Sequence, residues 1–243
     1  VRIIPIDSEQ SAIWQCLEGE DQTKLQRIYL TASGGPLRNK SLRALEKVSV
    51  QEALRHPRWG MGQKISGDSA TLMNKVLEIL EAMHLFKVPV EKIKVLVHPE
   101  AIIHSMIEFV DGIILAQLSA TDMRIPIQYA LTYPERLNNA RLPRIDFLKL
   151  KSLNFESPDY RHFPSLRLAY QAAQSSGTAP AVLNAANEIA VESFLKKKLL
   201  FILIAQTVEK VLSRHKNIKD PGLKDILAAD TWARQEAESL IRK

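Results

Sequence analysis

The chain has 243 residues, of which 46% are hydrophobic and 25% are charged, and its formal net charge is +6. This length suffices for one large or two smaller domains of ordinary globular composition. The basic residues are scattered without an arginine-rich tract, so nucleic-acid binding is not indicated. The longest apolar segment, residues 199–205, is too short to cross a membrane. The single cysteine, Cys16, excludes a disulfide framework and fits a reducing, intracellular setting.

Up to about residue 130, short apolar runs alternate with helical patterns, which predicts an α/β (α+β) domain with a mixed sheet. The expected strands are residues 2–6, 27–32, 93–97, 103–109 and 113–118. Asp111 and Gly112 form a hairpin turn signal between the last two of them. A helix is expected over residues 69–85, with Asp68 or Ser69 as its N-terminal cap.

Residues 131–162 predict an extended linker, because three prolines interrupt a segment without sustained periodicity. The remainder, residues 163–243, predicts a C-terminal all-α helical bundle. Pro180 is expected to open one of its helices and Asp230 to cap the last. The expected helices cover about 164–175, 180–198, 201–215 and 230–242.

Two carboxylates lie two residues apart near the start of the chain. Asp7, Ser8 and Glu9 directly follow the expected strand at residues 2–6. Carboxylate oxygens are the ligands that Mg²⁺ and Mn²⁺ prefer, so this triplet predicts half of a site for one of these ions. Such a site needs a third carboxylate and a polyanionic substrate that shares the metal.

The helix expected over residues 69–85 supplies a candidate for that third carboxylate. On a helical wheel Asn74, Lys75 and Glu78 share a face with Thr71, away from the apolar stripe. The start of a helix and a lysine favour phosphate binding, and Glu78 lies one turn further along. The alternative is a solvated helix face on which Lys75 and Glu78 form an ordinary ion pair.

Two segments rich in small or polar residues suggest contacts with a ligand. Ser33 begins a Ser-Gly-Gly turn after a strand, whose backbone N–H groups are able to approach an anion; the alternative is a plain tight turn. Residues 56–62 place His56, Trp59 and Met61 beside glycines, which predicts a lid over a ligand. The alternative for Trp59 and Met61 is burial in the core.

Other polar residues are interpreted as structural. His98 and His104 flank a pair of isoleucines and favour internal hydrogen bonds over metal binding. Asn184, Asn187 and Glu188 form a polar cluster in an otherwise apolar helix. We expect this cluster to make buried hydrogen bonds at a domain contact and not to take part in chemistry.

Seven motifs, taken in chain order, favour the functional interpretations of these residues over the structural alternatives. They are PIDSE (5–9), LTASGGP (30–36), HPRWGMG (56–62), KISGDSATLMNK (64–75), HPEAIIHS (98–105), DMR (122–124) and LNAANE (183–188). Taken together they resemble those of the 1-deoxy-D-xylulose 5-phosphate reductoisomerase family, from the first residue to nearly the last. That family uses NADPH and a divalent metal to convert deoxyxylulose phosphate into 2-C-methylerythritol 4-phosphate in non-mevalonate isoprenoid synthesis.

The resemblance implies roles for individual residues. Asp7, Glu9 and Glu78 are expected to hold Mg²⁺ or Mn²⁺, and with His56 and Trp59 they form the expected catalytic set. Gly62 is expected to contact NADPH, and His104 to lie near the site. The side chains expected to bind the phosphorylated substrate are Ser8, Ser33, His56, Trp59, Met61, Ser69, Asn74 and Lys75.

The chain departs from the family pattern in two ways. Gly60 stands where the lid motif usually has serine, and no residue matches the NADPH-binding domain or the lysine that this domain supplies near the substrate. We therefore expect an upstream segment before Val1 and no reduction by this part alone. Alternatives are a non-catalytic ligand-binding or dimerisation module and, less favoured, a metal-dependent phosphatase or lyase. The resemblance also implies a homodimer located in the bacterial cytoplasm, or in the plastid stroma of a eukaryote.

Overall fold

The structure, a computed structural model, describes residues 1, 3–55 and 62–242. These residues form two compact units, each built from two stretches of sequence. The first unit comprises Val1–Ser33 and Glu81–Pro158, and the second comprises Gly34–Leu80 and Asp159–Lys243. The three-part division expected at residues 130 and 162 stays a prediction.

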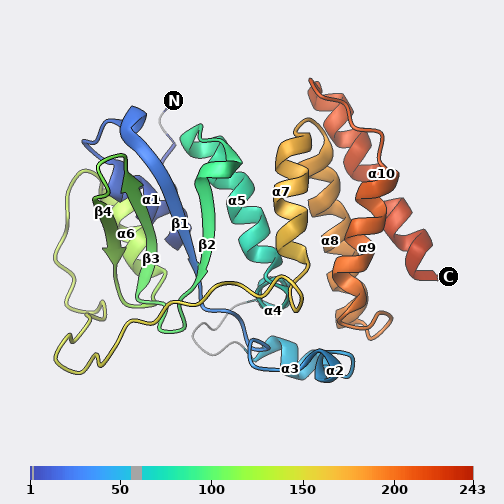
Figure 1. Cartoon of the computed structure of the whole chain (residues 1–243), viewed down its shortest axis with the longest axis horizontal. Coiled ribbons are helices and arrows are strands. Elements are labelled where there is room, and N and C mark those ends of the chain that lie inside the picture. Colours follow the sequence, from blue (N-terminus) through green and yellow to red (C-terminus); the bar gives the residue numbers. More distant parts are fainter. Residues whose placement is uncertain (2, 56–61, 243) are drawn as a thin grey trace. The chain divides into compact units, whose positions relative to one another are not determined.

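The first unit is built on a four-stranded mixed sheet with the strand order β2-β1-β3-β4 (Figure 1). β1 pairs in parallel with β2 and antiparallel with β3, and β3 pairs antiparallel with β4. The strands are β1 (Leu25–Ala32), β2 (Ile93–Val97), β3 (Ile103–Phe109) and β4 (Ile114–Leu118). The mixed sheet and four of the five expected strands are thereby confirmed.

The core of the first unit lies between this sheet and helix α1 (Ser8–Leu17), which packs against β3 and β4. Ile28 on β1 aligns with Ile93 on β2 and with Ile107 on β3, and all three side chains are fully buried. Ile13, on α1, is fully buried as well. The other helices of this unit are η1 (Gln22–Lys24), η2 (Val90–Lys92), α6 (Arg124–Thr132) and the second half of α5 (Met73–Phe86).

The segment from Tyr133 to Pro158 has neither helix nor strand apart from one isolated bridge between Val97 and Glu156. Near this bridge the Asn154 side-chain amide donates to a carboxylate oxygen of Glu100 over 2.7 Å. These contacts fasten the end of the segment beside β2. Residues 133–158 thus lack regular structure apart from this bridge, and the linker expected over residues 131–162 stays a prediction.

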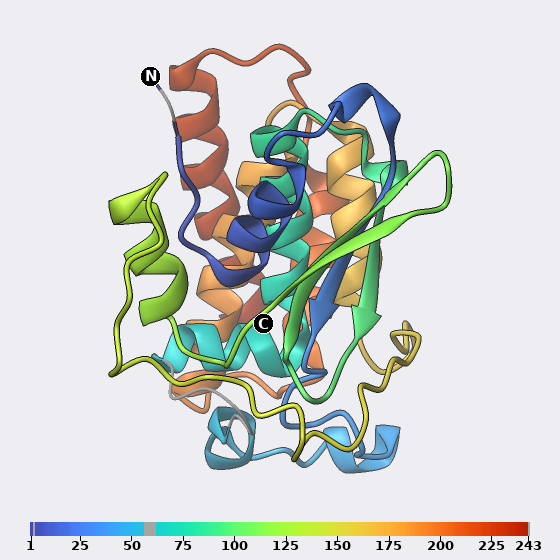
Figure 2. The ribbon, with the colours of Figure 1, turned by 90° about the vertical axis from the view of Figure 1, so that its left-hand side faces the viewer.

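The second unit is helical, and α8 is its central element. This helix packs against α7, α9 and α10 and also against α4. Small and branched side chains such as Ala186, Ala190 and Val191 are fully buried there, which permits close helix packing. The helices are α2 (Leu42–Leu45), α3 (Val50–Leu54), α4 (Gln63–Thr71), the first half of α5, α7 (Ser165–Ser175), α8 (Ala179–Leu195), α9 (Leu203–Arg214) and α10 (Leu223–Arg242). Figure 2 shows α2–α5 in light blue and cyan and α7–α10 in orange to red, and the expected bundle is confirmed.

The strand expected at residues 2–6 is wrong for the part that the structure describes, residues 3–6. Pro5 has no backbone N–H to give to a sheet, and Ile3 is 71% exposed. The chain instead runs into α1, for which Asp7 is the N-terminal cap.

Two expected helix starts are also wrong. The helix over residues 69–85 is two helices, because Leu72 adopts the left-handed conformation with φ 58°. The last helix begins at Leu223, so Asp230 lies inside it and pairs with Arg234 one turn later. Among the described residues, no helix combines the length and the hydropathy that a membrane crossing requires.

Candidate functional site

The Asp7-Ser8-Glu9 triplet lies in the first unit at the beginning of α1. The Asp7 carboxylate accepts the backbone N–H of Ser8 over 3.0 Å, and the Ser8 hydroxyl donates to Glu9 over 2.5 Å. All three side chains are partly exposed. Negative charge at the start of a helix is stabilised by the unpaired N–H groups there. The local fold therefore keeps two carboxylates together and partly accessible.

The next residue links α1 to α5. Gln10 is 1% exposed, and its side-chain amide donates to Glu81 on the second half of α5 over 3.3 Å. The start of α1 thus lies beside the second half of α5 within the first unit.

In the second unit, predicted phosphate ligands lie on both sides of the break between α4 and α5. Ser69 lies in the last turn of α4, whereas Asn74 and Lys75 lie in the first turn of α5. The Thr71 hydroxyl accepts the backbone N–H of Met73 across the break over 3.3 Å. Ser69 is therefore not the cap that the sequence predicted, because it belongs to the preceding helix.

Glu78 accepts hydrogen bonds from both of the residues on α5 that are predicted to bind phosphate. Asn74 donates its amide to one carboxylate oxygen over 2.5 Å, and the Lys75 ammonium donates to the other over 2.5 Å. Lys75 is 4% exposed and Glu78 only 2%. The solvated helix face that was the alternative is therefore wrong, because this charge pair is buried.

The Ser33-Gly34-Gly35 turn approaches, at Gly35, the last turn of α4. Gly35 has φ +70°, and a β-carbon there would lie 2.5 Å from the carbonyl oxygen of Ser69. Only glycine fits so close a contact at this φ. The backbone of Gly35 therefore lies against the last turn of α4 within the second unit.

Asp68, beside Ser69, is a buried carboxylate inside α4 and not the helix cap that the sequence predicted. It is 1% exposed, accepts a hydrogen bond from Asn187 on α8 over 2.9 Å and pairs with Lys64 over 2.6 Å. Burial raises the pKa of Asp68, and the contacts with Lys64 and Asn187 oppose that rise only in part. The pair Asp68–Asn187 fixes α4 against α8.

In the polar cluster of α8 only the hydrogen bond from Asn187 to Asp68 is buried as expected, whereas those of Asn184 and Glu188 are partly exposed. The amide of Asn184 donates to Glu188 over 3.1 Å, and Arg234 on α10 donates to the same carboxylate over 2.6 Å. These contacts and the one from Asn187 hold the helical unit together.

The two histidines also have structural partners. His98 is fully buried; its Nδ1 lies 2.8 Å from the carbonyl oxygen of Asn154, and its Nε2 accepts the backbone N–H of Ile102. The ring is therefore the tautomer with the proton on Nδ1, which donates to Asn154. His104 is 5% exposed and its Nε2 lies 3.2 Å from the carbonyl oxygen of Ser119.

The predicted lid falls outside the part of the chain that the structure describes. His56, Trp59 and Met61, together with Gly60, belong to residues 56–61. Gly62, the predicted cofactor contact, is described and is the N-terminal cap of α4. Among the described residues, no atom lies within 4 Å of the place a β-carbon would take. The first unit thus carries Asp7, Ser8, Glu9 and Ser33, and the second carries Ser69, Asn74, Lys75 and Glu78.

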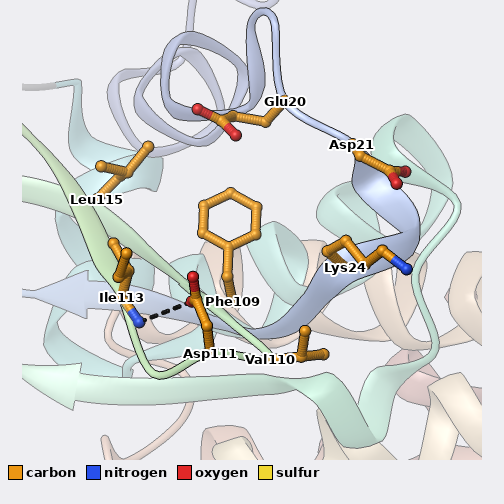
Figure 3. A pocket seen from close by; sticks show the side chains of 8 residues that line it. All are labelled: Glu20, Asp21, Lys24, Phe109, Val110, Asp111, Ile113 and Leu115. Carbon is orange, nitrogen blue, oxygen red and sulfur yellow. Dashed lines mark hydrogen bonds between the residues drawn. The ribbon is translucent and has the colours of Figure 1, made fainter.

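A cavity of about 250 Å³ in the first unit is separate from these residues (Figure 3). It lies at the hairpin turn, where the backbone N–H of Ile113 donates to Asp111 over 3.0 Å. Phe109 lies at the centre of the lining side chains, and Glu20, Asp21 and Lys24 line the cavity from the segment before β1. None of its lining residues belongs to the predicted site.

Two family models match the chain. The model described as the 1-deoxy-D-xylulose 5-phosphate reductoisomerase C-terminal domain matches residues 3–86, and the one described as the DXP reductoisomerase C-terminal domain matches residues 118–236. The chain belongs to the 1-deoxy-D-xylulose 5-phosphate reductoisomerase family. The resemblance seen in the seven motifs is thereby confirmed.

Individual reductoisomerases are similar over the whole chain. The enzyme of Desulforamulus reducens is 55% identical over 242 residues, and that of Pelotomaculum thermopropionicum is 53% identical over 240 residues. These matches cover 100% and 99% of this chain but 62% of each relative. The chain therefore spans less than two thirds of the length of these reductoisomerases.

Solved reductoisomerase structures have the same fold. The Zymomonas mobilis enzyme in complex with NADPH is 47% identical with a TM-score of 0.91, covering 98% of this chain and 62% of that one. A DOX-P reductoisomerase in complex with NADPH, fosmidomycin and magnesium is 41% identical with a TM-score of 0.90, covering 99% and 63%.

Proposed function

We propose that this chain is the metal- and substrate-binding part of an NADPH-dependent 1-deoxy-D-xylulose 5-phosphate reductoisomerase. Such an enzyme forms 2-C-methyl-D-erythritol 4-phosphate for non-mevalonate isoprenoid synthesis. The observation that carries the proposal is the hydrogen-bonded cluster of Asn74, Lys75 and Glu78 on α5, in which Lys75 and Glu78 are buried, in a chain similar throughout to reductoisomerases. It joins two donors suited to phosphate with a carboxylate suited to a hard cation.

Asp7, Glu9 and Glu78 are the proposed ligands of Mg²⁺ or Mn²⁺. Their chemistry fits, because all three offer the hard oxygen atoms that these ions prefer. The hydrogen bond from Gln10 to Glu81 supports the set: Gln10 follows Glu9 on α1, and Glu78 precedes Glu81 by about one turn of α5. A solved relative in complex with NADPH, fosmidomycin and magnesium supports the same choice of metal.

The residues of this chain would bind and orient the substrate. Ser33, Ser69, Asn74 and Lys75 would hold its phosphate, and Ser8 would contact the carbon backbone. The phosphate does not react, so its binding energy serves to position the reacting carbons. When bound, the divalent cation supplies a Lewis acid that stabilises negative charge developing on the substrate oxygens.

Two proposed contributions depend wholly or partly on residues beyond those described. His56, Trp59 and Met61 would close over the bound substrate and exclude water, which protects a reactive carbonyl until hydride transfer. NADPH would bind mainly to a part of the protein corresponding to the unmatched length of the relatives, with Gly62 beside it. Complexes of related reductoisomerases with NADPH support this cofactor.

We further propose that the protein is a homodimer that pairs through β4. This strand is at the edge of the sheet, and Ile114 on it and Ile113 beside it are 49% and 57% exposed. An exposed apolar edge strand is suited to pairing with another chain. The bacterial origin of the relatives supports a cytoplasmic location.

Isothermal titration with Mn²⁺ tests the proposed metal site. The substitution Glu78→Gln keeps the shape of the side chain and removes its charge, so it should weaken Mn²⁺ binding at least tenfold. Glu192→Gln removes an exposed carboxylate of α8 and is the matched control, for which no change is expected. Mn²⁺ affinity unaltered by Glu78→Gln would exclude Glu78 from the site. Metal-dependent NADPH oxidation with deoxyxylulose phosphate by the whole protein tests the reaction.

A further inference from the structure

The proposed phosphate ligands and the proposed metal ligands meet at one side chain, that of Glu78. Both of the proposed phosphate donors on α5, Asn74 and Lys75, direct their hydrogen bonds to Glu78, and each takes a different carboxylate oxygen. The same carboxylate is the proposed metal ligand. Without ligands, the phosphate donors are therefore engaged by a group that the metal would also use.

Because of the charges in this cluster, the divalent cation and the ammonium of Lys75 compete for Glu78. Lys75 and Glu78 are both almost completely buried, so their attraction is screened much less than that of an exposed pair. A divalent cation held by Glu78 would repel the nearby ammonium of Lys75. The balance of forces on Lys75 would then favour an anion over its own carboxylate partner.

We propose that Glu78 couples metal binding to phosphate binding by exchanging Lys75 and Asn74 for the divalent cation. This inference rests on the proposed function, since it assigns a regulatory role to residues of that site. With the cation bound, Lys75 and Asn74 donate to the phosphate of the substrate. With neither ligand bound, the internal hydrogen bonds compensate the buried charges, and each ligand alone binds less tightly.

Thermodynamic linkage gives the coupling a measurable signature. The factor by which Mn²⁺ raises the affinity for phosphate must equal the factor by which phosphate raises the affinity for Mn²⁺. A factor of about ten is expected, which corresponds to one hydrogen bond to a charged group. Inorganic phosphate is the suitable probe, because it lacks the ketone and hydroxyl oxygens with which the substrate would chelate the metal.

The decisive experiment is isothermal titration of inorganic phosphate into Glu78→Gln without metal. The neutral amide attracts Lys75 less, so this variant should bind phosphate about tenfold more tightly than the unchanged protein, and Mn²⁺ should no longer raise the affinity. Glu81→Gln is the control: it removes a carboxylate one turn further along α5, and its amide oxygen is still able to accept the hydrogen bond from Gln10. This control should keep both the phosphate affinity and the effect of Mn²⁺.

The possible failures are distinguishable. If Glu78→Gln loses Mn²⁺ binding but binds phosphate no more tightly, the coupling is wrong and the proposed metal site stands. If Glu78→Gln keeps full Mn²⁺ affinity, the proposed metal site itself is wrong. If Glu81→Gln raises the phosphate affinity equally, the effect is one of general charge and the coupling is again wrong. Titration of the unchanged protein with and without Mn²⁺ provides a test that needs no variant: equal phosphate affinities would overturn the proposal.

Discussion

The backbone at Gly35 lies so close to Ser69 that a β-carbon at residue 35 would be 2.5 Å from the Ser69 carbonyl oxygen. Gly35 also has φ +70°, which side chains rarely adopt. The turn after β1 is thereby held against the last turn of α4.

The substitution Gly35→Ala should lower the free energy of unfolding by about 2–4 kcal/mol, from backbone strain and from the clash together. It should also weaken phosphate binding, because the turn must move away from Ser69. Gly19→Ala is the control, since Gly19 has φ +85° but, within the described part of the chain, no atom within 4 Å of the position that a β-carbon would take. Chemical denaturation should show a loss of only about 1–2 kcal/mol for the control. Equal losses would refute the clash.

The buried carboxylate of Asp68 predicts a pH-dependent stability. Its pKa is raised in the folded protein, so between the ordinary value of 3.8 and the folded value the native state binds more protons than the unfolded chain. This group's contribution to stability is present below pH 3.8 and falls as the pH rises through that window. Asp68→Asn removes this pH dependence. Denaturation at a series of pH values should therefore show that the free energy of unfolding of the variant rises relative to that of the unchanged protein as the pH rises.

Asp21 provides a control of opposite sign for that experiment. Hydrogen bonds from the Thr23 side chain and backbone lower the pKa of Asp21. The contribution of Asp21 to stability is therefore present above its ordinary pKa and is lost as the pH falls. Asp21→Asn should be less stable than the unchanged protein at neutral pH but not at low pH. The same direction of change in both variants would contradict the assignment for Asp68.

The single cysteine should report local opening of the first unit. Cys16 is 8% exposed, and burial raises its pKa to about 11. At pH 8 its thiolate fraction is then about a hundredfold below that of an unshifted thiol, and the thiolate is the reactive form. Iodoacetamide should modify Cys16 at least a hundredfold more slowly in the folded protein than in urea, as followed by mass spectrometry. Comparable rates in the two conditions would show that α1 opens readily.

Asn217 should stabilise the start of α8 from outside that helix. Its side-chain oxygen accepts the backbone N–H groups of Thr178 and Ala179 over 3.0 and 3.1 Å. Asn217→Ala leaves these two donors without that partner and should cost about 1–2 kcal/mol in a thermal or chemical unfolding measurement. Asn138→Ala, which removes one exposed hydrogen bond from Arg144, should stay within about 0.5 kcal/mol. A similar cost for both variants would argue against capping by Asn217.

The strands were predictable because their alternation of buried and exposed residues is local. β1 carries Ile28 and Leu30 on its buried face, and the Asp111-Gly112 turn is a short-range signal. The i, i+3 and i, i+4 spacings that bring Lys75 and Asn74 to Glu78 are equally local, so periodicity alone predicted that cluster.

The break at Leu72 was not predictable in the same way. Leucine favours helix, and no glycine or proline marks the position. The break coincides with a tertiary contact, in which the Ser165 hydroxyl donates to the carbonyl oxygen of Thr71. Asp68 was misassigned as a cap for a related reason, since its partner Asn187 lies 119 residues further along the chain.

The start of α10 did carry a local signal that the sequence reading missed. Asp225 accepts the backbone N–H of Gly222 over 2.9 Å in the first turn of the helix. An acidic residue three positions after glycine marks this start, whereas the more conspicuous Asp230 lies inside the helix and pairs with Arg234.

The interleaving of the two units constrains how the protein folds. β1 and β2 are neighbours in the sheet, yet the segment between them contributes Gly34–Leu80 to the other unit. The pairing of β1 with β2 closes a long loop and therefore costs conformational entropy. This cost is offset only when the residues of the loop form structure of their own. No single cut of the chain separates one complete unit from the other. Folding of the sheet and of the helices that carry the phosphate donors is therefore expected to be one cooperative process, and the slow step should be the closure of β1 on β2.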